Sequence, residues 1–206
     1  MADFESCWSA ADPAVLRCLE LAHASLLAGG LPCGAVVVDK DGTPVSEGRN
    51  RAYDQPGGKE RLQRTPIAHA EMNALAAIDT DTNLGALRLV SSHRPCQMCS
   101  AACAFTEVGD VDFVAPDPSD PDTYPDPDGM PAEWVVVANL LFLTGVANYS
   151  GPSAPMIARA SEREPEVADL MRLVDVNDLN RGTLREALSP RWPEISAAAH
   201  RRRQRR

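Results

Sequence analysis

Several features that mark whole classes of proteins are scarce in this sequence. Aromatic residues make up 5% of the 206 residues, and no uninterrupted apolar run approaches 18 residues, so we expect no transmembrane helix. Residues 1–5 (MADFE) have neither the positive charge nor the apolar core of a signal peptide, which favours a cytoplasmic protein. With 44% hydrophobic and 24% charged residues, positions 1–206 predict a single globular domain that needs no disulfide framework.

Positive charge is also scarce. Lys and Arg number 20 against 29 Asp and Glu, and the formal net charge is −9. An acidic protein repels a phosphate backbone, so we do not expect a nucleic acid as partner. The tail, residues 200–206, holds five of the 20 basic residues and is the segment that could hold phosphates locally. We predict that this Arg-rich tail is a solvated, frayed end.

Local patterns predict alternating helices and strands up to residue 115. A helix over 12–28 has Asp12 as its cap, Pro13 in its first position and two glycines after its end. Two β-rich runs joined by an Asp-Gly turn indicate a hairpin, and four more elements follow. The predicted strands and helices after the first helix are strands 34–39 and 44–49, helix 65–78, strand 87–91, helix 95–106 and strand 110–115. This order predicts a three-layer α/β/α fold with a mixed central sheet.

Beyond residue 115 the pattern changes. Residues 116–131 contain six prolines and five aspartates. Because each proline removes a backbone donor and restricts its predecessor, we expect no regular structure in this Asp/Pro-rich insertion. An insertion of this length is functional or disordered, and it could fold over a pocket as a lid. An apolar segment at 134–146 and a Glu/Arg-rich segment at 161–189 then indicate a C-terminal helical extension over about 134–199.

Three residues have the chemistry of zinc ligands. Cys96 and Cys99 are three positions apart at the predicted start of a helix, so their side chains project to one side and the helix N-terminus favours thiolates. His69 lies near the start of another predicted helix. Zinc accepts imidazole and thiolate, and a catalytic zinc takes three protein ligands plus water. We therefore predict a catalytic Zn²⁺ bound by His69, Cys96 and Cys99.

Glu71 supplies the acid/base group that a bare metal site lacks. A carboxylate beside a zinc-activated water can take one of its protons and pass it onward. The run His69-Ala70-Glu71, followed by Pro95-Cys96-Gln97-Met98-Cys99, matches the H-x-E…P-C-x-x-C signature of zinc-dependent base deaminases. In that signature the glutamate is not a ligand. Glu71 is therefore the predicted catalytic residue.

On these motifs the chain resembles the cytidine deaminase-like superfamily, and within it the branch of guanine deaminases and tRNA adenosine deaminases. Residues 32–38 (PCGAVVV), 47–51 (EGRNR) and 69–75 (HAEMNAL) are also similar to that branch, and the resemblance spans about 12–115. It implies a zinc-dependent hydrolase that converts the exocyclic amino group of a small nucleobase or nucleoside to a carbonyl. A guanine-type base is the first candidate. The resemblance also implies a homodimer with helices packed across the two-fold axis.

We expect Asn50, Ala70 and His93 to contact the substrate. The amide of Asn50, at the end of a predicted strand, could pair with a carbonyl or ring nitrogen, and His93 could contact the substrate or the leaving ammonia. Two positions depart from the branch. Cys33 stands where Phe is common and changes the packing near the pocket, and Arg94 stands where Glu is common and places a cation beside the ligand loop.

Other interpretations of the same residues stay open. The three ligands could form a structural zinc site or only pack, and Cys103 with Cys96 and Cys99 could suggest an iron–sulfur cluster, although Cys103 is expected in the core. Asn50 could be a turn residue that satisfies its own backbone. The alternative substrates are adenosine in tRNA, a cytosine-type base or a specialised metabolite. The alternative outside enzymes is a zinc-stabilised binding module, against which Glu71 argues.

Overall fold

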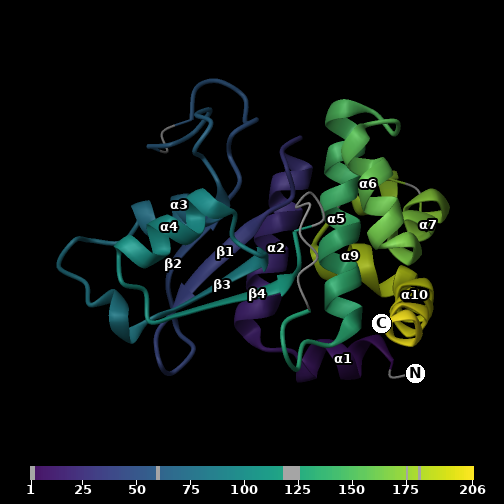
Figure 1. Ribbon diagram of the computed structural model, residues 1–206, viewed down its shortest axis with the longest axis horizontal. Coiled ribbons are helices and arrows are strands. Elements are labelled where there is room, and N and C mark those ends of the chain that lie inside the picture. Colours follow the sequence, from purple (N-terminus) through teal and green to yellow (C-terminus); the bar gives the residue numbers. More distant parts are fainter. Residues whose placement is uncertain (1–2, 59–60, 118–125, 175, 181) are drawn as a thin grey trace.

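The computed structural model describes residues 3–58, 61–117, 126–174, 176–180 and 182–206. Most of the predicted Asp/Pro-rich insertion, residues 118–125, lies outside the described residues. At the centre is a four-stranded sheet in the order β2-β1-β3-β4 (Figure 1). Its strands are β1 (Gly34–Val38), β2 (Pro44–Arg49), β3 (Arg88–His93) and β4 (Asp110–Ala115). β1 pairs antiparallel with β2 and β3, whereas β3 and β4 run parallel, so the sheet is mixed.

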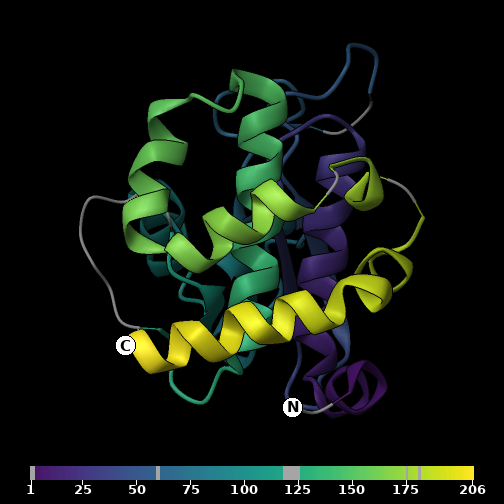
Figure 2. The same ribbon diagram turned by 90° about the vertical axis from the view of Figure 1, so that its right-hand side faces the viewer.

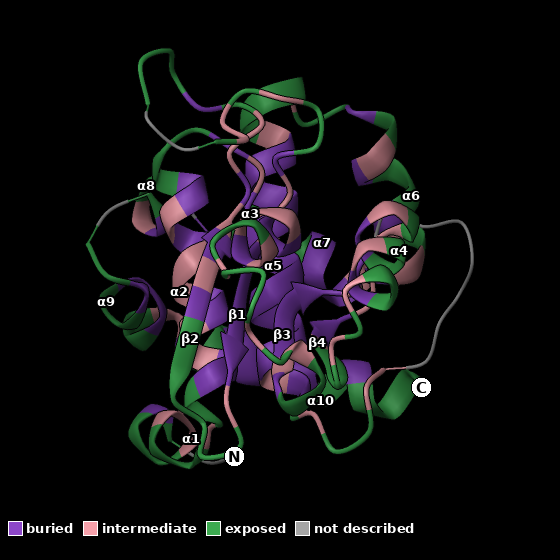
Figure 3. Ribbon diagram, turned by 90° about the vertical axis from the view of Figure 1, so that its left-hand side faces the viewer, coloured by how far each residue is buried: buried purple, intermediate pink, exposed green. Residues whose placement is uncertain are grey.

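Helices cover both faces of this sheet. Alternate residues of β1 belong to two separate apolar clusters, as the period-2 geometry of a strand requires. Val36 and Val38 pack on the side of α2 (Pro13–Leu27) and α5 (Ala132–Ser150). Ala35 and Val37 pack on the side of α3 (Ala70–Ala76) and α4 (Gln97–Phe105). Figure 3 shows the buried sheet beneath α3 and α4. The predicted three-layer α/β/α fold with a mixed sheet is confirmed.

Short-range signals place α2 and the hairpin where the sequence predicts them. The side chain of Asp12 accepts a hydrogen bond from the Ala14 N–H at 2.8 Å, and Pro13 occupies the first turn. Gly29 follows the helix with φ 76°, in the left-handed region that favours glycine. Gly42, with φ 80°, makes the tight turn between β1 and β2.

The prediction for the next helix is wrong at its start. α3 begins at Ala70 instead of near Thr65, because Thr65 donates its hydroxyl to the Leu62 carbonyl and lies in a turn. His69 holds the N-cap position in extended conformation, with φ −70° and ψ 160°. The local cap-and-proline signal therefore marks a turn, and the helix starts where the chain meets the sheet.

A set of C-terminal helices packs beyond α5. These helices are α6 (Pro155–Arg163), α7 (Pro165–Leu173), α8 (Val176–Leu179), α9 (Leu184–Leu188) and α10 (Trp192–Arg205). An N-terminal helix, α1 (Phe4–Ala10), was not among the predicted elements, and short 3₁₀ turns lie at Leu84–Ala86 and Ser189–Arg191. In Figure 2, α10 crosses α5, and it also contacts α7. Phe4 of α1 packs edge-on against Trp192 at 5.2 Å between ring centroids, which joins the two ends of the chain.

α5 is the apolar helix of this region. By length and composition it could cross a membrane, with a mean hydropathy of 1.3 over 18 residues, although the sequence contains no uninterrupted apolar run of that length. Within the protein, 78% of that window is buried, which is also what the core helix of a folded domain shows. It contacts α2, α6, α7, α10 and β4.

The prediction of a frayed Arg-rich tail is wrong. α10 continues to Arg205, and Arg202 is 1% exposed. Its guanidinium donates to both carboxylate oxygens of Glu164, at 2.6 and 2.7 Å, and of Asp126, at 2.5 and 2.7 Å. Carboxylates that are distant in sequence therefore order the tail. The sequence of the tail alone does not reveal these partners.

Candidate functional site

The predicted zinc ligands come together at the N-termini of α3 and α4. His69 is the N-cap of α3, Cys96 is the N-cap of α4, and Cys99 lies in the first turn of α4. The Sγ atoms of the two cysteines are 3.6 Å apart, and each lies 3.6 Å from His69 Nδ1. No other group of three potential metal ligands of this kind is found within the described ranges of the chain.

This triangle has the dimensions of one face of a zinc tetrahedron. With Zn–S of about 2.3 Å and Zn–N of about 2.0–2.1 Å, tetrahedral angles place two thiolates about 3.8 Å apart and a thiolate and an imidazole nitrogen about 3.6 Å apart. The donor set and the 3.6 Å edges both fit Zn²⁺. His69 and Cys96 are half-buried and line a pocket, whereas Cys99 is fully buried.

Electrostatics also favour a cation at this point. Burial, and secondarily the charge of Glu71, raises the pKa of the Cys99 thiol well above its ordinary range. A thiolate at this position is therefore stable only when a cation compensates its charge. Cys103, one turn further along α4, is 4% exposed and packs in the apolar cluster with Leu89 and Ala74, as predicted. It is not part of the ligand triangle.

Glu71 lies beside the triangle, in the first turn of α3. Its side chain is buried, with 6% of the residue exposed. Oε1 accepts a hydrogen bond from the Ser91 hydroxyl at 3.0 Å, and Ser91 in turn is a buried residue of β3. One carboxylate oxygen is thus fixed to the sheet, and the orientation of the other oxygen is set with it.

The ligand triangle and Glu71 border a pocket of about 200 Å³. The predicted contact residues Asn50, Ala70 and His93 all line it, together with Cys33 and Arg94. The remaining lining residues were not among the predicted site residues: Leu31, Ser91, Asp117, Phe142 and Met156. Phe142 and Met156 belong to α5 and α6, and Asp117 lies in the proline-rich segment, so no local motif marked them.

Asn50 and Ala70 both have hydrogen-bonding capacity at the pocket. Asn50 is 2% exposed, and its Oδ1 accepts from the Ala52 N–H at 3.1 Å, as a turn residue would. Its Nδ2 amide has no partner among the described residues. Ala70 occupies the first position of α3, so its N–H has no acceptor within the helix. Two donors are therefore available beside the ligand triangle.

His93 forms a neutral wall of the pocket. Its ring lies 4.9 Å from the ring of Phe142, between centroids. Burial lowers the pKa of His93 to about 4, although the charge of Asp117 acts in the opposite direction. The hydroxyl of Ser92 accepts from the Gly34 N–H at 3.1 Å and lies 3.2 Å from His93 Nδ1. Ser92 thus links the start of β1 to the ring of His93.

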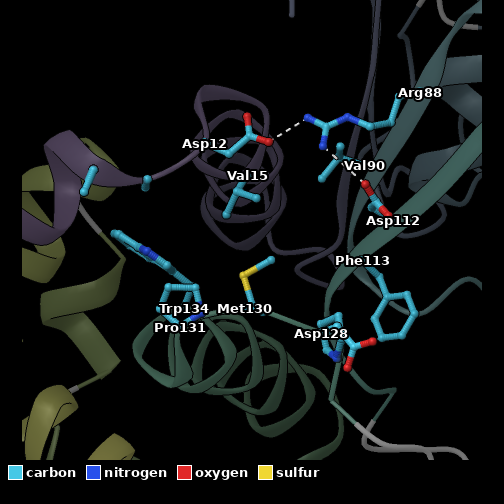
Figure 4. Close-up of a pocket in the computed structure, with 14 residues that line it drawn as sticks. Asp12, Val15, Arg88, Val90, Asp112, Phe113, Asp128, Met130, Pro131 and Trp134 are labelled. Carbon is cyan, nitrogen blue, oxygen red and sulfur yellow. Dashed lines mark hydrogen bonds and ion pairs between the residues drawn. The ribbon is translucent and has the colours of Figure 1, made fainter.

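A second hollow, of about 380 Å³, lies at the opposite end of β3 (Figure 4). There Arg88 bridges Asp12, at 2.6 Å, and Asp112, at 3.2 Å, across from Trp134 and Met130. These ion pairs connect the start of α2 to the sheet. The hollow lies away from the ligand triangle, because Arg88 begins β3 and His93 ends it.

The fold and the site together define a class of protein: a mixed α/β/α domain with a His-Cys-Cys zinc-type centre and a buried carboxylate beside it. The family model for the cytidine and deoxycytidylate deaminase zinc-binding region matches residues 11–115, half of the chain. The chain belongs to this family of zinc-type deaminases. A comparison with curated proteins finds no match.

Solved structures that are similar to the chain include guanine deaminase from Bacillus subtilis, with 28% identity, a TM-score of 0.41 and coverage of 56% of this chain and 66% of that one. NE0047 in complex with 2,6-diaminopurine shows 26% identity, a TM-score of 0.45 and coverage of 62% and 70%. A tRNA deaminase of A-to-I editing at the wobble position shows 29% identity, a TM-score of 0.39 and coverage of 50% and 70%. The chain thus spans about two thirds of the length of each.

Proposed function

We propose that this protein is a hydrolytic deaminase that replaces an exocyclic amino group of a small purine-type base or nucleoside with a carbonyl and releases ammonia. A guanine-type base is the first candidate substrate. The observation that carries the proposal is the buried Glu71 carboxylate beside the His69, Cys96 and Cys99 triangle, at the edge of a small pocket. A binding module stabilised by zinc has no use for a buried acid/base group at that position.

Zinc held by His69, Cys96 and Cys99 would lower the pKa of a water and act as a Lewis acid. Because Ser91 engages Oε1 of Glu71, we assign proton transfer to Oε2. Glu71 accepts a proton from the attacking water, delivers it to the ring nitrogen of the substrate, and moves the next proton to the leaving amine. Water adds to the amino-bearing carbon, the C–N bond breaks, and the products are a carbonyl compound and ammonia.

The pocket donors would hold the substrate for this attack. The Asn50 amide and the Ala70 N–H suit a carbonyl or ring nitrogen of the base, because both are donors. His93 is neutral and close to the ligand loop, where it would contact the substrate or the departing ammonia. Arg94 and Asp117 add charged groups to the same pocket.

The size and charge of the protein favour a small substrate over RNA. The pocket measures about 200 Å³, a small volume. A nucleotide flipped out of RNA enters a site together with its flanking backbone and therefore needs more space around the pocket. Four arginines of the tail already pair with carboxylates of the protein: Arg202 with Asp126 and Glu164, Arg203 with Glu133, Arg205 with Glu166, and Arg206 with Glu164. Phosphates would have to compete with these pairs, so the tail supports RNA binding less than its sequence suggests.

A homodimer and a cytoplasmic location belong to the same proposal. Phe105, at the end of α4, is 88% exposed, which does not fit the core position expected for an aromatic side chain. A second copy packed against α4 would cover it, in keeping with the helix packing that the resemblance implies. Sedimentation equilibrium of the wild type and of Phe105→Ser tests this assembly, and a monomeric wild type would contradict it.

The experiment is a measurement of ammonia release from free bases, nucleosides and a short RNA, with wild type and Glu71→Gln. We expect about one zinc per chain in both proteins, because Glu71 is not a ligand, and a rate lower by about 10²–10⁴-fold in the variant. The Cys96→Ala variant should bind no zinc and should be less stable than the wild type. Turnover of Glu71→Gln within a few-fold of wild type would contradict the mechanism, and faster turnover of RNA than of any small substrate would contradict the substrate class.

A further inference from the structure

A third, smaller hollow adjoins the catalytic pocket. It measures about 120 Å³ and shares the side chains of Leu31 and Met156 with the catalytic pocket, so these two residues form a common wall. Its other walls include Tyr53, from the loop after β2, and Tyr149, from the last turn of α5. In Figure 1 the loop after β2 and the C-terminal end of α5 both lie at the top of the molecule.

The chemistry of this hollow is apolar and aromatic. The rings of Tyr53 and Tyr149 are 4.5 Å apart between centroids, at an interplanar angle of 52°. Yet they are 42% and 65% exposed, so much of their aromatic surface faces water. No Asp, Glu, Lys or Arg is among the described residues that line the hollow. Ligand sites are typically lined by apolar and aromatic side chains of this kind.

The two walls are held in place before any ligand arrives. On one side, Arg49 donates two hydrogen bonds of 2.7 Å to Asp54, the neighbour of Tyr53, and Asp54 is only 7% exposed. On the other side, a Cβ added to Gly145 of α5 would lie 2.1 Å from Pro32 Cδ. The close approach at Gly145 fixes α5 against the loop that carries Leu31. A rigid platform loses little conformational entropy when it binds a ligand.

We propose that the hollow formed by Tyr53, Tyr149, Leu31 and Met156 is a substrate subsite. It takes an uncharged ring substituent, such as a sugar or an aryl group, attached to the heterocycle that is deaminated. This inference rests on the proposed function and narrows its substrate from a base or nucleoside to a base that carries a neutral ring. The shared lining residues Leu31 and Met156 place the hollow next to the catalytic pocket, which supports a substituent attached to the bound heterocycle. The lack of a charged lining residue within the described chain disfavours a phosphate.

The test compares a base with its own ring-substituted form, for example guanine with guanosine, on wild type, Tyr149→Ala and Tyr149→Phe. In Tyr149→Ala we expect the KM of the substituted substrate to rise about fivefold or more, with kcat and the kinetics of the free base unchanged. Tyr149→Phe, which keeps the ring, should behave as wild type. Leu173→Ala removes another exposed apolar side chain, on α7, and serves as the control for surface changes.

Equal changes for both substrates, or none for either, would overturn the subsite. If the wild type deaminates neither compound, the proposed function fails on that pair, and equilibrium binding then decides the subsite by itself. Isothermal titration of the zinc-loaded protein with the same two compounds should show tighter binding of the substituted one, and the difference should vanish in Tyr149→Ala. Equal affinities in the wild type would overturn the subsite independently of turnover.

Discussion

At the scale of single residues, the hydrogen bond between Ser91 and Glu71 is a feature of the site that lies outside the family motif. A buried carboxylate can rotate about its terminal torsion, and a hydrogen bond to one oxygen limits that freedom. Because Ser91 belongs to β3 and Glu71 to α3, the hydrogen bond also ties the acid/base group to the sheet. In the proposed mechanism Ser91 is therefore a positioning residue, which acts on the reaction only through Glu71.

Ser91→Ala should lower kcat by roughly tenfold, the size of effect typical of residues that orient groups around a metal centre. KM and zinc content should stay near their wild-type values, since Ser91 is not a ligand. Ser91→Thr keeps the hydroxyl and should restore most of the rate. Steady-state kinetics with a metal assay separate these outcomes. A fall in zinc content, or equal rates in Ser91→Ala and wild type, would contradict the positioning role.

His93 gives a pH dependence of stability whose sign follows from its burial. Its pKa is lowered to about 4 in the folded protein, and in the unfolded chain it returns to about 6.5. Between these values the unfolded state binds more protons, so the free energy of unfolding falls as the pH falls from 6.5 toward 4. Above pH 6.5 both states are neutral at this residue, and the contribution is complete.

Chemical denaturation at pH 7 and pH 5 tests this dependence in wild type and His93→Asn. Wild type should lose roughly 2 kcal/mol more than the variant between these values. His23 is also buried and its pKa is also lowered, but it is present in both proteins and cancels in the comparison. Equal losses in the two proteins would show that His93 is not the group that titrates.

At the scale of elements, sequence patterns predict what short-range interactions determine. The cap at Asp12, the turn at Gly42 and the buried run of β3 fix their elements locally, and all three are confirmed. The start of α3 depends on where the chain meets β2, and the order of α10 depends on distant carboxylates. Neither interaction leaves a periodic or capping signal in the sequence.

The same division applies to the site. His69, Cys96 and Cys99 are predictable because they belong to two short motifs, each near the start of a predicted helix. The structure places their ligand atoms 3.6 Å apart. Phe142 and Met156 are not predictable, because their spacing indicates only a buried helix. Their place in the pocket depends on how α5 and α6 pack against the deaminase region, which requires the tertiary structure.

Gly48 shows how a strand positions the metal ligand. A Cβ at this residue of β2 would lie 2.2 Å from the Ala70 carbonyl and 2.4 Å from the Ala74 nitrogen, both backbone atoms of α3. Gly48→Ala must therefore displace α3, and with it His69 and Glu71. We expect lower stability by about 1–3 kcal/mol and reduced zinc content.

Val45→Ala is the matched control, because Val45 lies on the same strand and is 45% exposed. It should leave the zinc content and the rate of ammonia release unchanged. Thermal unfolding with a zinc assay on purified proteins distinguishes the two variants. A Gly48→Ala protein with full zinc content and normal stability would show that α3 can move without disturbing the ligands.

At the scale of the whole molecule, Arg202 connects three distant segments. It joins α10 to Glu164, at the start of α7, and to Asp126, in the segment between β4 and α5. Breaking a buried ion pair by removing one partner costs about 3–5 kcal/mol, because a charge is left without its partner. Arg202→Leu should reduce the free energy of unfolding by that amount in urea denaturation.

Arg201→Ala is the control for the general charge of the tail, because Arg201 is exposed on the same helix. Its stability should stay within about 0.5 kcal/mol of wild type. Arg202→Lys keeps the charge but not the planar fork that engages two carboxylates at once, so it should recover only part of the loss. Equal midpoints for the Arg202→Leu and Arg201→Ala proteins would show that the buried network adds no net stability.

The close contact of Gly145 with Pro32 has a consequence for how such an enzyme can diversify. The ligand triangle and Glu71 lie wholly within residues 11–115, whereas Phe142, Tyr149 and Met156 come from the helices that follow. In the proposed function the metal ligands and the acid/base group thus come from the first half of the chain, whereas the second half supplies part of the pocket lining. The two halves approach closely at Gly145 and Pro32. Substitutions in the second half that preserve Gly145 would therefore change part of the pocket lining without changing the residues that hold the metal.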